Sequence, residues 1–314
     1  MTPPSPSGWK NCSPPPPELA RLLAQARRGV SLAPLTTWGI GGPAEYLLAP
    51  TTPEDAAAVL AAARQAGWPV FFLGRGSNVL IADAGLPGIT LHLTNFCREI
   101  NVGAESVTVG AGVFLPRLAV YLAQQGWSGY EFLIGIPGTV GAAVRLNAGT
   151  GPGQEMATRV INVTVLTDDL QVQTLPAAAL DFGYRSSLLL ERPRWLILSA
   201  TLQLSERADP AALQARQRAI IQGRRARFPS EKLTCGSVFK NPSGGPPAGW
   251  LIEQCGFKGK AVGDAQVSTK HANFIINRGR ATADQMQALM HAIQEKVWQK
   301  FSIALEREVV CLPG

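Results

Sequence analysis

The most informative stretch of the sequence is Val70-Phe71-Phe72-Leu73-Gly74-Arg75-Gly76-Ser77-Asn78. Its four apolar residues predict a short buried strand, and the glycines after them predict a tight loop. Glycines let a backbone approach a phosphate closely, and successive N–H groups form a nest that binds an anion. This strand and loop therefore predict a site for a phosphate-bearing ligand.

The segments around this loop predict an alternation of helices and strands. Thr52-Pro53-Glu54-Asp55 is typical of a helix start, with a Thr N-cap, Pro at the first helical position and acids in the first turn. Gly67 is suited to end this helix in a left-handed conformation. The apolar residues 79–82 and 89–93 predict two further strands.

A second glycine-rich segment is Gly135-Ile136-Pro137-Gly138-Thr139-Val140-Gly141, and Asn147-Ala148-Gly149 follows it. Two such segments in one half of the chain favour a ligand site more than either does alone. The common nucleotide-binding patterns do not fit. Gly39-Ile40-Gly41-Gly42-Pro43-Ala44 has no convincing strand before it, and the P-loop sequence G-x-x-x-x-G-K-[ST] is absent.

The rest of the chain predicts an α+β protein. Strands are expected over 99–113, 158–173 and 195–204, and short helices over 19–28 and from residue 115 to Gly126. Asp209-Pro210 predicts the start of a long helix that reaches about Gly223. Thr282 with Gln285 predicts a capping box for the last helix. We expect a Pro-rich disordered tail over 1–18, followed by domains over 19–98, 99–206 and 207–314.

Composition excludes several classes of protein. Apolar residues make up 46% of the 314, which excludes global disorder, and the longest uncharged apolar stretch (132–144) is broken by Pro137 and cannot cross a bilayer. The five cysteines show no C-x-x-C pair, so neither a disulfide framework nor a zinc site is expected. With three histidines, no metal site of any kind is expected. No secretion signal is present, and we expect a cytoplasmic protein.

Charge is concentrated in one part of the chain. Residues 207–280 hold 13 Lys/Arg against 4 Asp/Glu, a net charge of +9, whereas the whole chain carries +7. This imbalance indicates an anionic ligand, with phosphate and carboxylate as the usual candidates. Nucleic acid is the competing interpretation, but no aromatic series or nucleic-acid motif accompanies the basic residues.

Several motifs, in order along residues 28–312, resemble those of the MurB family of UDP-N-acetylenolpyruvoylglucosamine reductases. They are Leu35-Thr36-Thr37-Trp38, Ile40-Gly41-Gly42-Pro43-Ala44, residues 74–80, residues 135–141 with 147–149, Phe182-Gly183-Tyr184-Arg185, Gly236-Ser237-Val238-Phe239-Lys240-Asn241-Pro242, Ala248-Gly249-Trp250-Leu251-Ile252-Glu253 and Leu305-Glu306-Arg307-Glu308-Val309. The short spacing between residues 242 and 248 resembles the subclass with the smaller substrate domain.

The resemblance implies a two-lobed FAD-binding domain of the vanillyl-alcohol-oxidase-like type and a C-terminal α/β substrate-binding domain. It implies FAD and NADPH as cofactors, UDP-N-acetylglucosamine enolpyruvate as substrate, and no nucleic acid or membrane as partner; a monomer is expected. The implied FAD-binding residues are Gly74, Arg75, Gly76, Ser77, Asn78, Val79, Gly135, Ile136, Pro137, Gly138, Thr139, Gly141 and Asn147.

Three catalytic residues follow from the resemblance. Arg185 is implied to contact the enolpyruvyl carboxylate, Glu308 to polarise and orient the unsaturated acid, and Ser237 to protonate the substrate carbon. The motif Ser237-Val238-Phe239-Lys240 also matches the S-x-x-K signature of β-lactamases, but Asn241-Pro242 disfavours the helix that this signature needs.

Further residues are implied to bind substrate: Tyr184, Arg227, Lys240, Asn241 and Gln266. The chain departs from the family pattern over 147–153, where a tyrosine is lost and a residue gained. Two alternatives stay open at this point. One is a related flavin oxidase acting on an alcohol or sugar, and the other is a non-enzymatic nucleic-acid binder built on the basic half.

Overall fold

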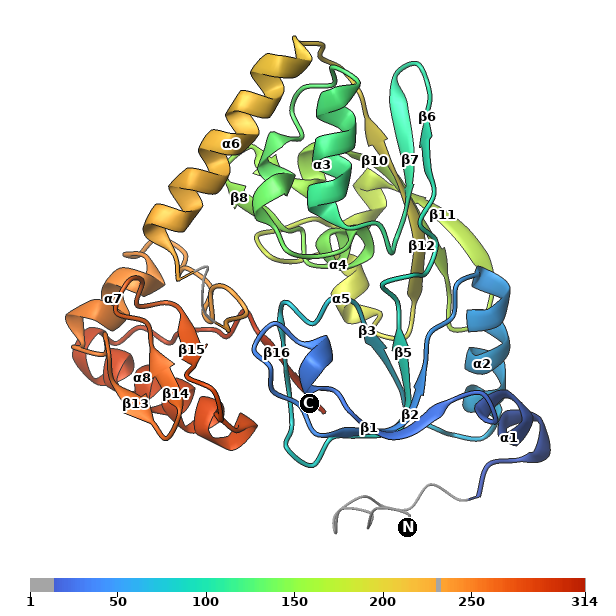
Figure 1. Cartoon of the computed structure of the whole chain (residues 1–314), viewed down its shortest axis with the longest axis horizontal. Coiled ribbons are helices and arrows are strands. Elements are labelled where there is room, and N and C mark those ends of the chain that lie inside the picture. The colour runs from blue at the N-terminus through green and yellow to red at the C-terminus, as the bar shows by residue number, and fades with distance from the viewer. Residues whose placement is uncertain (1–13, 230–232, 314) are drawn as a thin grey trace.

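The computed structural model describes residues 14–229 and 233–313, which form three lobes at the corners of a triangle (Figure 1). The first lobe contains a four-stranded sheet whose strands, in spatial order, are β1 (Arg27–Ser31), β2 (Pro43–Leu48), β5 (Leu86–His92) and β3 (Val70–Leu73). The β1–β2 pair is antiparallel, whereas β2–β5 and β5–β3 are parallel. Helices α1 (Pro17–Leu23) and α2 (Pro53–Gln65) share an apolar core with this sheet. A short 3-10 turn, η1 (Ala33–Leu35), and the separate strand β4 (Val79–Ile81) complete the lobe.

The local predictions for this lobe are largely confirmed. The Thr52 hydroxyl accepts a hydrogen bond from the Asp55 N–H at 3.2 Å, and Gly67 has φ +66°. The structure differs at the start, because α1 begins at Pro17 and ends at Leu23 instead of covering 19–28. Proline is favoured at a first helical position, and Arg27 and Arg28 already pair with β2. Residues 1–13 of the predicted tail lie outside the described residues.

The second lobe is built on a five-stranded antiparallel sheet. In spatial order its strands are β11 (Val172–Pro176), β10 (Val160–Leu166), β12 (Leu196–Gln203), β7 (Ser106–Gly110) and β6 (Ile100–Val102). The remaining elements are α3 (Leu115–Gln124), η2 (Glu131–Gly135), α4 (Val140–Arg145), the hairpin strands β8 (Gly149–Gly151) and β9 (Gln154–Glu155), η3 (Met156–Thr158), η4 (Ala177–Leu180) and α5 (Leu188–Glu191). Helices α3 and α4 contribute to one buried apolar core with the sheet.

The third lobe is reached through the long helix α6 (Pro210–Arg227), which runs from the second lobe to the third (Figure 1). Asp209 caps its start, as predicted, by accepting from the Ala212 N–H at 2.9 Å. The helix continues four residues past Gly223, because one glycine costs a helix only about 1 kcal/mol and arginines follow it. It stops at Phe228, the residue before Pro229, where proline disfavours helical geometry.

The third lobe itself packs α7 (Ala248–Gln254) and α8 (Ala283–Phe301) against a small antiparallel sheet. The strands of that sheet are β13 (Ala261–Val262), β14 (Ala265–Val267) and β15 (Ile275–Asn277). The predicted capping box of Thr282 and Gln285 starts α8. The last strand, β16 (Val310–Leu312), leaves this lobe and pairs in parallel with β4 of the first lobe. The predicted boundary between residues 206 and 207 stays a prediction.

The first and third lobes are joined by buried contacts. Trp38 of the first lobe is fully buried in the core of the third lobe, and its indole N–H donates to the Ile275 carbonyl at 2.8 Å. The Asn277 amide donates to the Trp38 carbonyl at 2.9 Å. The Asp83 carboxylate accepts from the N–H groups of Ala283 and Asp284, at the start of α8. Within the described part of the chain, no helix has both the length and the apolar character to span a membrane.

Candidate active site

The two glycine-rich segments lie against each other between the first and second lobes. A Cβ placed on Gly74 would be 3.4 Å from the Thr139 hydroxyl, and one on Gly138 would be 3.9 Å from the Ser77 hydroxyl. These are ordinary van der Waals distances, so no protein atom occupies the place that a Cβ would take at either glycine. The structure therefore brings the two predicted cofactor loops together.

The backbone of these loops is available to an anion. None of the N–H groups from Gly74 to Asn78 donates to an acceptor in the described chain, and the same holds for Gly138 and Thr139. Consecutive N–H groups without partners form a nest that binds phosphate. Unpaired backbone donors are costly when buried, so a ligand at this position satisfies a need of the fold.

Three other predicted cofactor glycines serve packing. A Cβ on Gly76 would lie 2.2 Å from the Leu35 carbonyl oxygen, and one on Gly141 would lie 3.0 Å from the Ala111 Cβ. A Cβ on Gly135 would lie 2.6 Å from the Arg224 Cδ. At these positions the absence of a side chain lets other protein atoms come close. The sequence alone does not distinguish such a glycine from one that lets a ligand approach. Of the other residues predicted in these loops, Ile136 packs on the second-lobe core, Pro137 is exposed, and Val79 begins β4.

One end of the first loop opens into a cationic cavity of about 150 Å³. Arg75 lines it, and its guanidinium lies 4.3 Å from the centre of the Phe114 ring. Arg98 lines it as well and donates to the Asn95 side-chain oxygen at 3.2 Å. No described carboxylate pairs with either arginine. This end of the loop is suited to a diphosphate.

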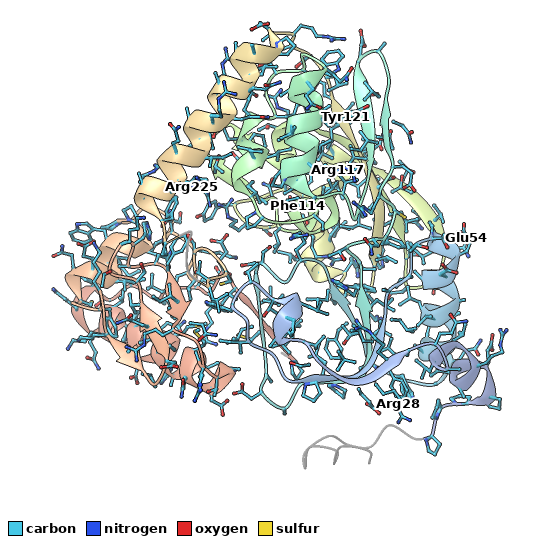
Figure 2. The ribbon with its side chains drawn as sticks, viewed as in Figure 1. Arg28, Glu54, Phe114, Arg117, Tyr121 and Arg225 are labelled. Carbon is cyan, nitrogen blue, oxygen red and sulfur yellow. The ribbon has the colours of Figure 1, made fainter. Side chains whose placement is uncertain are left out.

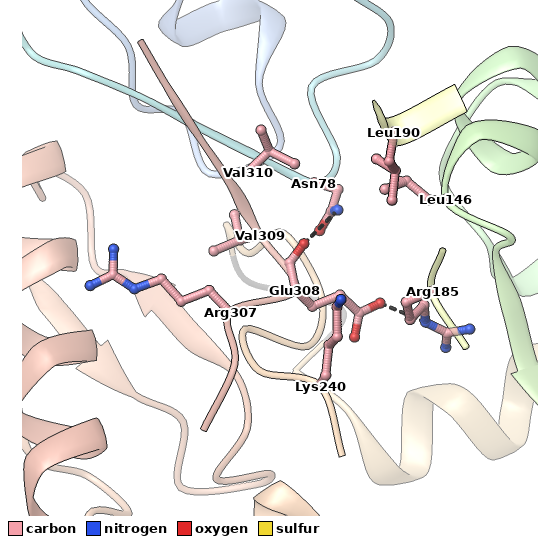
Figure 3. Close-up of a pocket in the computed structure, with 9 residues that line it drawn as sticks. All are labelled: Asn78, Leu146, Arg185, Leu190, Lys240, Arg307, Glu308, Val309 and Val310. Atoms are coloured by element: carbon pink, nitrogen blue, oxygen red, sulfur yellow. Dashed lines mark hydrogen bonds and ion pairs between the residues drawn. The ribbon is translucent and has the colours of Figure 1, made fainter. Parts of the chain in front are cut away.

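The other end of the same loop lines a second cavity, of about 130 Å³ (Figure 3). Here the Arg185 Nε donates to the Glu308 carboxylate at 2.7 Å, and both side chains are about one-fifth exposed. Lys240 also lines the cavity, and its ammonium pairs with Glu306. Figure 3 shows Arg307 extending away from the Arg185–Glu308 pair. The cavity therefore joins residues that are far apart in sequence at the Asn78 end of the loop.

Arg185 is held by a strained two-residue turn. Gly183 and Ser186 exchange backbone hydrogen bonds of 3.1 and 3.2 Å around it, and Arg185 has φ +54°, a conformation that non-glycine residues rarely adopt. The Asn147 amide donates to the Gly183 carbonyl at 2.8 Å. The Arg185 Nη2 donates to the Gly149 carbonyl at 2.8 Å, so the altered 149–153 segment, a β8–β9 hairpin, helps to aim the guanidinium.

Asn147 has a structural role in this site. Its side chain is buried, and both ends of its amide bind protein, because the Oδ1 also accepts from the Ala157 N–H at 2.9 Å. It supports the Arg185 turn, and cofactor contact by this amide stays a prediction.

The position of Glu308 is fixed by hydrogen bonds of its own backbone groups. Its N–H donates to the Val238 carbonyl at 2.8 Å, and its carbonyl accepts from the Asn78 amide at 3.0 Å. Burial raises the pKa of the Glu308 carboxyl above its ordinary value, although the positive charge of Arg185 opposes that rise. The first-loop Asn78 therefore supports the acid with its amide, and contact of Asn78 with the cofactor stays a prediction.

Ser237 lies one residue before the strand-like segment that pairs with Glu308. The preceding Gly236 has φ +90°, and Asn273 holds the next two residues: its carbonyl accepts from the Val238 N–H, and its side chain both accepts from and donates to the Phe239 backbone. Phe239 pairs with Arg307 in an extended bridge, so the S-x-x-K helix is absent, as predicted. The described lining of the 130 Å³ cavity does not include Ser237.

The predicted substrate-binding residues lie in different places. The Tyr184 hydroxyl accepts from the Asn241 N–H at 3.4 Å, and the Asn241 side chain accepts from the Ala248 N–H at the start of α7. Lys240 lines the cavity. Arg227 is exposed at the end of α6, and the Gln266 amide donates to the Gly259 carbonyl at 2.9 Å within the third lobe. Substrate contact by these residues stays a prediction.

Sequence reasoning missed two residues as site components. Asn273, which supports Ser237, is a buried asparagine two residues before the apolar strand β15, a pattern that could have indicated a backbone-binding amide. Arg224 lies on Gly135, and its only local signal is its place in a helix with five arginines and no acid. In the residues that the structure describes, no group of three His, Cys, Asp or Glu side chains is arranged to hold a metal ion.

Two family models match parts of this chain. A family model described as "UDP-N-acetylenolpyruvoylglucosamine reductase, C-terminal domain" matches residues 228–312, and one described as "FAD binding domain" matches residues 44–175. The second match contains both glycine loops, and the first contains Ser237 and Glu308.

Whole-chain relatives agree. A UDP-N-acetylenolpyruvoylglucosamine reductase from Synechococcus sp. (strain JA-3-3Ab) is 43% identical over 298 residues, which cover 95% of each chain. One from Gloeobacter violaceus is 40% identical over 91% of this chain and 95% of its own. The crystal structure of UDP-N-acetylenolpyruvylglucosamine reductase (MurB) from Thermus caldophilus superposes with a TM-score of 0.78 at 35% identity, over 92% of this chain and 99% of that one. From these matches and from the site, this chain belongs to the MurB family of UDP-N-acetylenolpyruvoylglucosamine reductases.

Proposed function

We propose that this protein is an FAD-dependent reductase that uses NADPH to convert UDP-N-acetylglucosamine enolpyruvate to UDP-N-acetylmuramate, a precursor of peptidoglycan. The observation that carries this proposal is the Arg185–Glu308 pair, 2.7 Å apart, in a cavity bordered by the Asn78 end of a glycine loop with unpaired N–H groups. A reductase of an unsaturated acid needs both parts: a place for the cofactor and cations for the acid.

The residues present fit FAD. The loop from Gly74 to Asn78 joins the cavity of Arg75 and Arg98 to the cavity of Arg185 and Glu308. We propose that Arg75, Arg98 and the loop N–H groups would hold the diphosphate of FAD. When bound, FAD would supply the hydride-transfer chemistry that links NADPH to the vinyl carbon of the substrate.

Arg185 is proposed to stabilise the charge that develops on the substrate. Hydride addition to C3 of the enolpyruvyl group pushes an electron pair through C2 onto the carboxylate. A guanidinium offers a planar pair of donors that matches a carboxylate, and a fixed cation near developing charge lowers the barrier. The Arg185 Nη1 donates to no acceptor in the described chain, whereas Nε binds Glu308 and Nη2 binds Gly149.

Glu308 is proposed to share Arg185 with the substrate carboxylate. Two carboxylates on one partly buried guanidinium repel each other unless one takes up a proton, and burial, which raises the pKa of Glu308, favours its neutral form. A protonated Glu308 then donates a hydrogen bond to the substrate and orients it.

Ser237 is proposed to give its proton to C2 after the hydride has arrived at C3. The hydroxyl is a weak acid, so it needs an adjacent cation and a fixed position. Asn273 fixes the backbone on the C-terminal side of the serine, and Lys240 of the same segment lines the 130 Å³ cavity.

A visible spectrum of the purified protein tests the proposal. We expect a flavin absorbance that NADPH bleaches without oxygen and that UDP-N-acetylglucosamine enolpyruvate then restores. UDP-N-acetylglucosamine, which lacks the enolpyruvyl group, is the control and should leave the protein bleached. A colourless protein that takes up no FAD, or one that a sugar bleaches without NADPH, would contradict the proposal.

A further inference from the structure

Arg224 lies directly on the second glycine loop. A Cβ added to Gly135 would be 2.6 Å from the Arg224 Cδ and 3.1 Å from its Nε, so the arginine occupies the space that a side chain at 135 would take. Arg224 belongs to the last turns of α6, and Gly135 is the first residue of the loop 135–141. A cation from the helix that leads to the third lobe is therefore placed against a proposed cofactor loop.

The charge of Arg224 has no acid partner in the described chain. Its guanidinium lies 5.0 Å from the centre of the Phe228 ring, and the side chain is partly buried. Arg227 follows three residues later on the same face of the helix, where like charges destabilise each other. Burial and the charge of Arg227 both lower the pKa of Arg224.

Arg216 of the same helix makes an ion pair that has a structural role. Arg216 reaches the same 3-10 element, η2, and pairs there with Glu131 at 3.3 Å. Both arginines thus dock α6 on η2, but only Arg216 is given a carboxylate. Arg224 has no described carboxylate at ion-pair distance, so its guanidinium is available to bind an anion.

We infer that Arg224 binds a phosphate group of a ligand lying along the loop 135–141. This inference rests on the proposed function, because FAD, NADPH and the UDP-sugar all carry a diphosphate into this region. Arginine forms paired hydrogen bonds with phosphate oxygens, and Arg227, one turn further on, adds a second positive charge. The ligand class is therefore a diphosphate ester, supplied either by the resident cofactor or by the two molecules that alternate in the cleft.

The experiment compares Arg224→Ala with Arg225→Ala by calorimetry, using FAD on the apoprotein and NADP⁺ and UDP on the flavin-loaded protein. Arg225 is exposed at the same end of α6 (Figure 2), and only its backbone carbonyl is used, by Lys270. A lost charge-assisted hydrogen bond predicts a Kd about 10- to 100-fold weaker for Arg224→Ala. We expect less than about a twofold change for Arg225→Ala, and an intermediate loss for Arg224→Lys.

Each binding measurement either identifies the ligand whose phosphate Arg224 binds or overturns the inference. Weakening confined to FAD assigns Arg224 to the cofactor, and weakening of NADP⁺ and UDP assigns it to the incoming ligands. Unchanged affinity for all three overturns the inference. Gly135→Ala displaces the arginine without removing it and should reproduce the same pattern, which keeps the test valid if Arg224→Ala does not fold. If the wild-type protein binds neither FAD nor NADP⁺, the proposed function fails instead.

Discussion

The third lobe meets its two neighbours in different ways. Against the first lobe it uses a buried tryptophan, backbone pairing of β16 with β4, and Asp83 at the start of α8. Against the second lobe, apart from the connecting helix α6, it uses the Arg185–Glu308 pair and the contact of Tyr184 with Asn241. The first set of contacts buries a large apolar side chain and binds backbone groups of the third lobe, whereas the second joins polar side chains and borders a cavity. We call the contacts with the first lobe the first seam and those with the second lobe the second seam. The first seam therefore sets the position of the third lobe. In the second seam, polar side chains that now bind each other can bind a ligand instead.

Trp38→Ala should give the largest effect, because it breaks the first seam. The side chain is fully buried and donates to the Ile275 carbonyl, so its removal leaves a large cavity and an unpaired acceptor. We expect a loss of about 4 kcal/mol in the free energy of unfolding, measured with urea. Trp298→Ala is the control, since that tryptophan is 57% exposed, and it should cost less than about 0.5 kcal/mol. Equal losses would show that the seam is not held by Trp38.

Arg185→Lys should break the second seam without altering stability to the same degree. Lysine keeps the charge and meets the same backbone strain at φ +54°, but it loses the planar fork. We expect the substrate-driven return of flavin absorbance to slow about 100-fold while bleaching by NADPH is preserved. Arg194→Lys, at an arginine that is 82% exposed, should change neither rate. Turnover at the wild-type rate would count against Arg185 as the carboxylate clamp.

Asp83→Ala tests a smaller part of the first seam. The carboxylate accepts two N–H groups at the start of α8, at 2.8 and 3.1 Å, where the helix dipole also favours a negative charge. We expect a loss of about 1 kcal/mol in the free energy of unfolding. Asp83→Asn keeps one acceptor and should lose less. A neutral result for Asp83→Ala would mean that Thr282 caps α8 alone.

The pH dependence of binding should sharpen the comparison at the second seam. Below its raised pKa, Glu308 is neutral and leaves Arg185 to the ligand carboxylate; above it, the ionised Glu308 competes. We therefore expect the Kd of UDP-N-acetylmuramate to weaken as pH rises from 5 to 8, by up to about tenfold. UDP-N-acetylglucosamine lacks that carboxylate, so the pH dependence of its Kd gives the contribution of the other titrating groups, including His271. Glu308→Gln should remove the difference between the two sugars, and a difference that survives in this variant would exclude Glu308 as its source.

Local structure was well predicted because its signals lie close together in the sequence. The caps at Thr52, Asp209 and Thr282 involve residues three positions apart, and the structure confirms all three. The glycine loop after β3 was also predicted, because an apolar run and glycines are read directly from neighbouring residues. The family resemblance then indicated which distant residues share a function.

Contacts between distant segments left no local signal. Trp38 belongs to the core of a lobe whose strands begin more than 200 residues later, and Asp83 caps a helix that is 200 residues away. The glycines show the same limit: a glycine that borders a ligand and one that admits Arg224 look alike in sequence. The amides of Asn147 and Asn78 bind the backbone carbonyls of Gly183 and Glu308, and these links between distant segments also left no local signal.

The roles proposed for the residues at the second seam are tested most directly by Ser237→Ala. The two half-reactions are followed separately under anaerobic conditions. The serine is proposed to act only after hydride has reached the substrate, and a positioned acid contributes about 10²- to 10⁴-fold in rate. We predict that bleaching by NADPH stays within about twofold of wild type, while recolouring by UDP-N-acetylglucosamine enolpyruvate slows at least 100-fold. An equal slowing of both steps, or no slowing of the second, would contradict this account of the site.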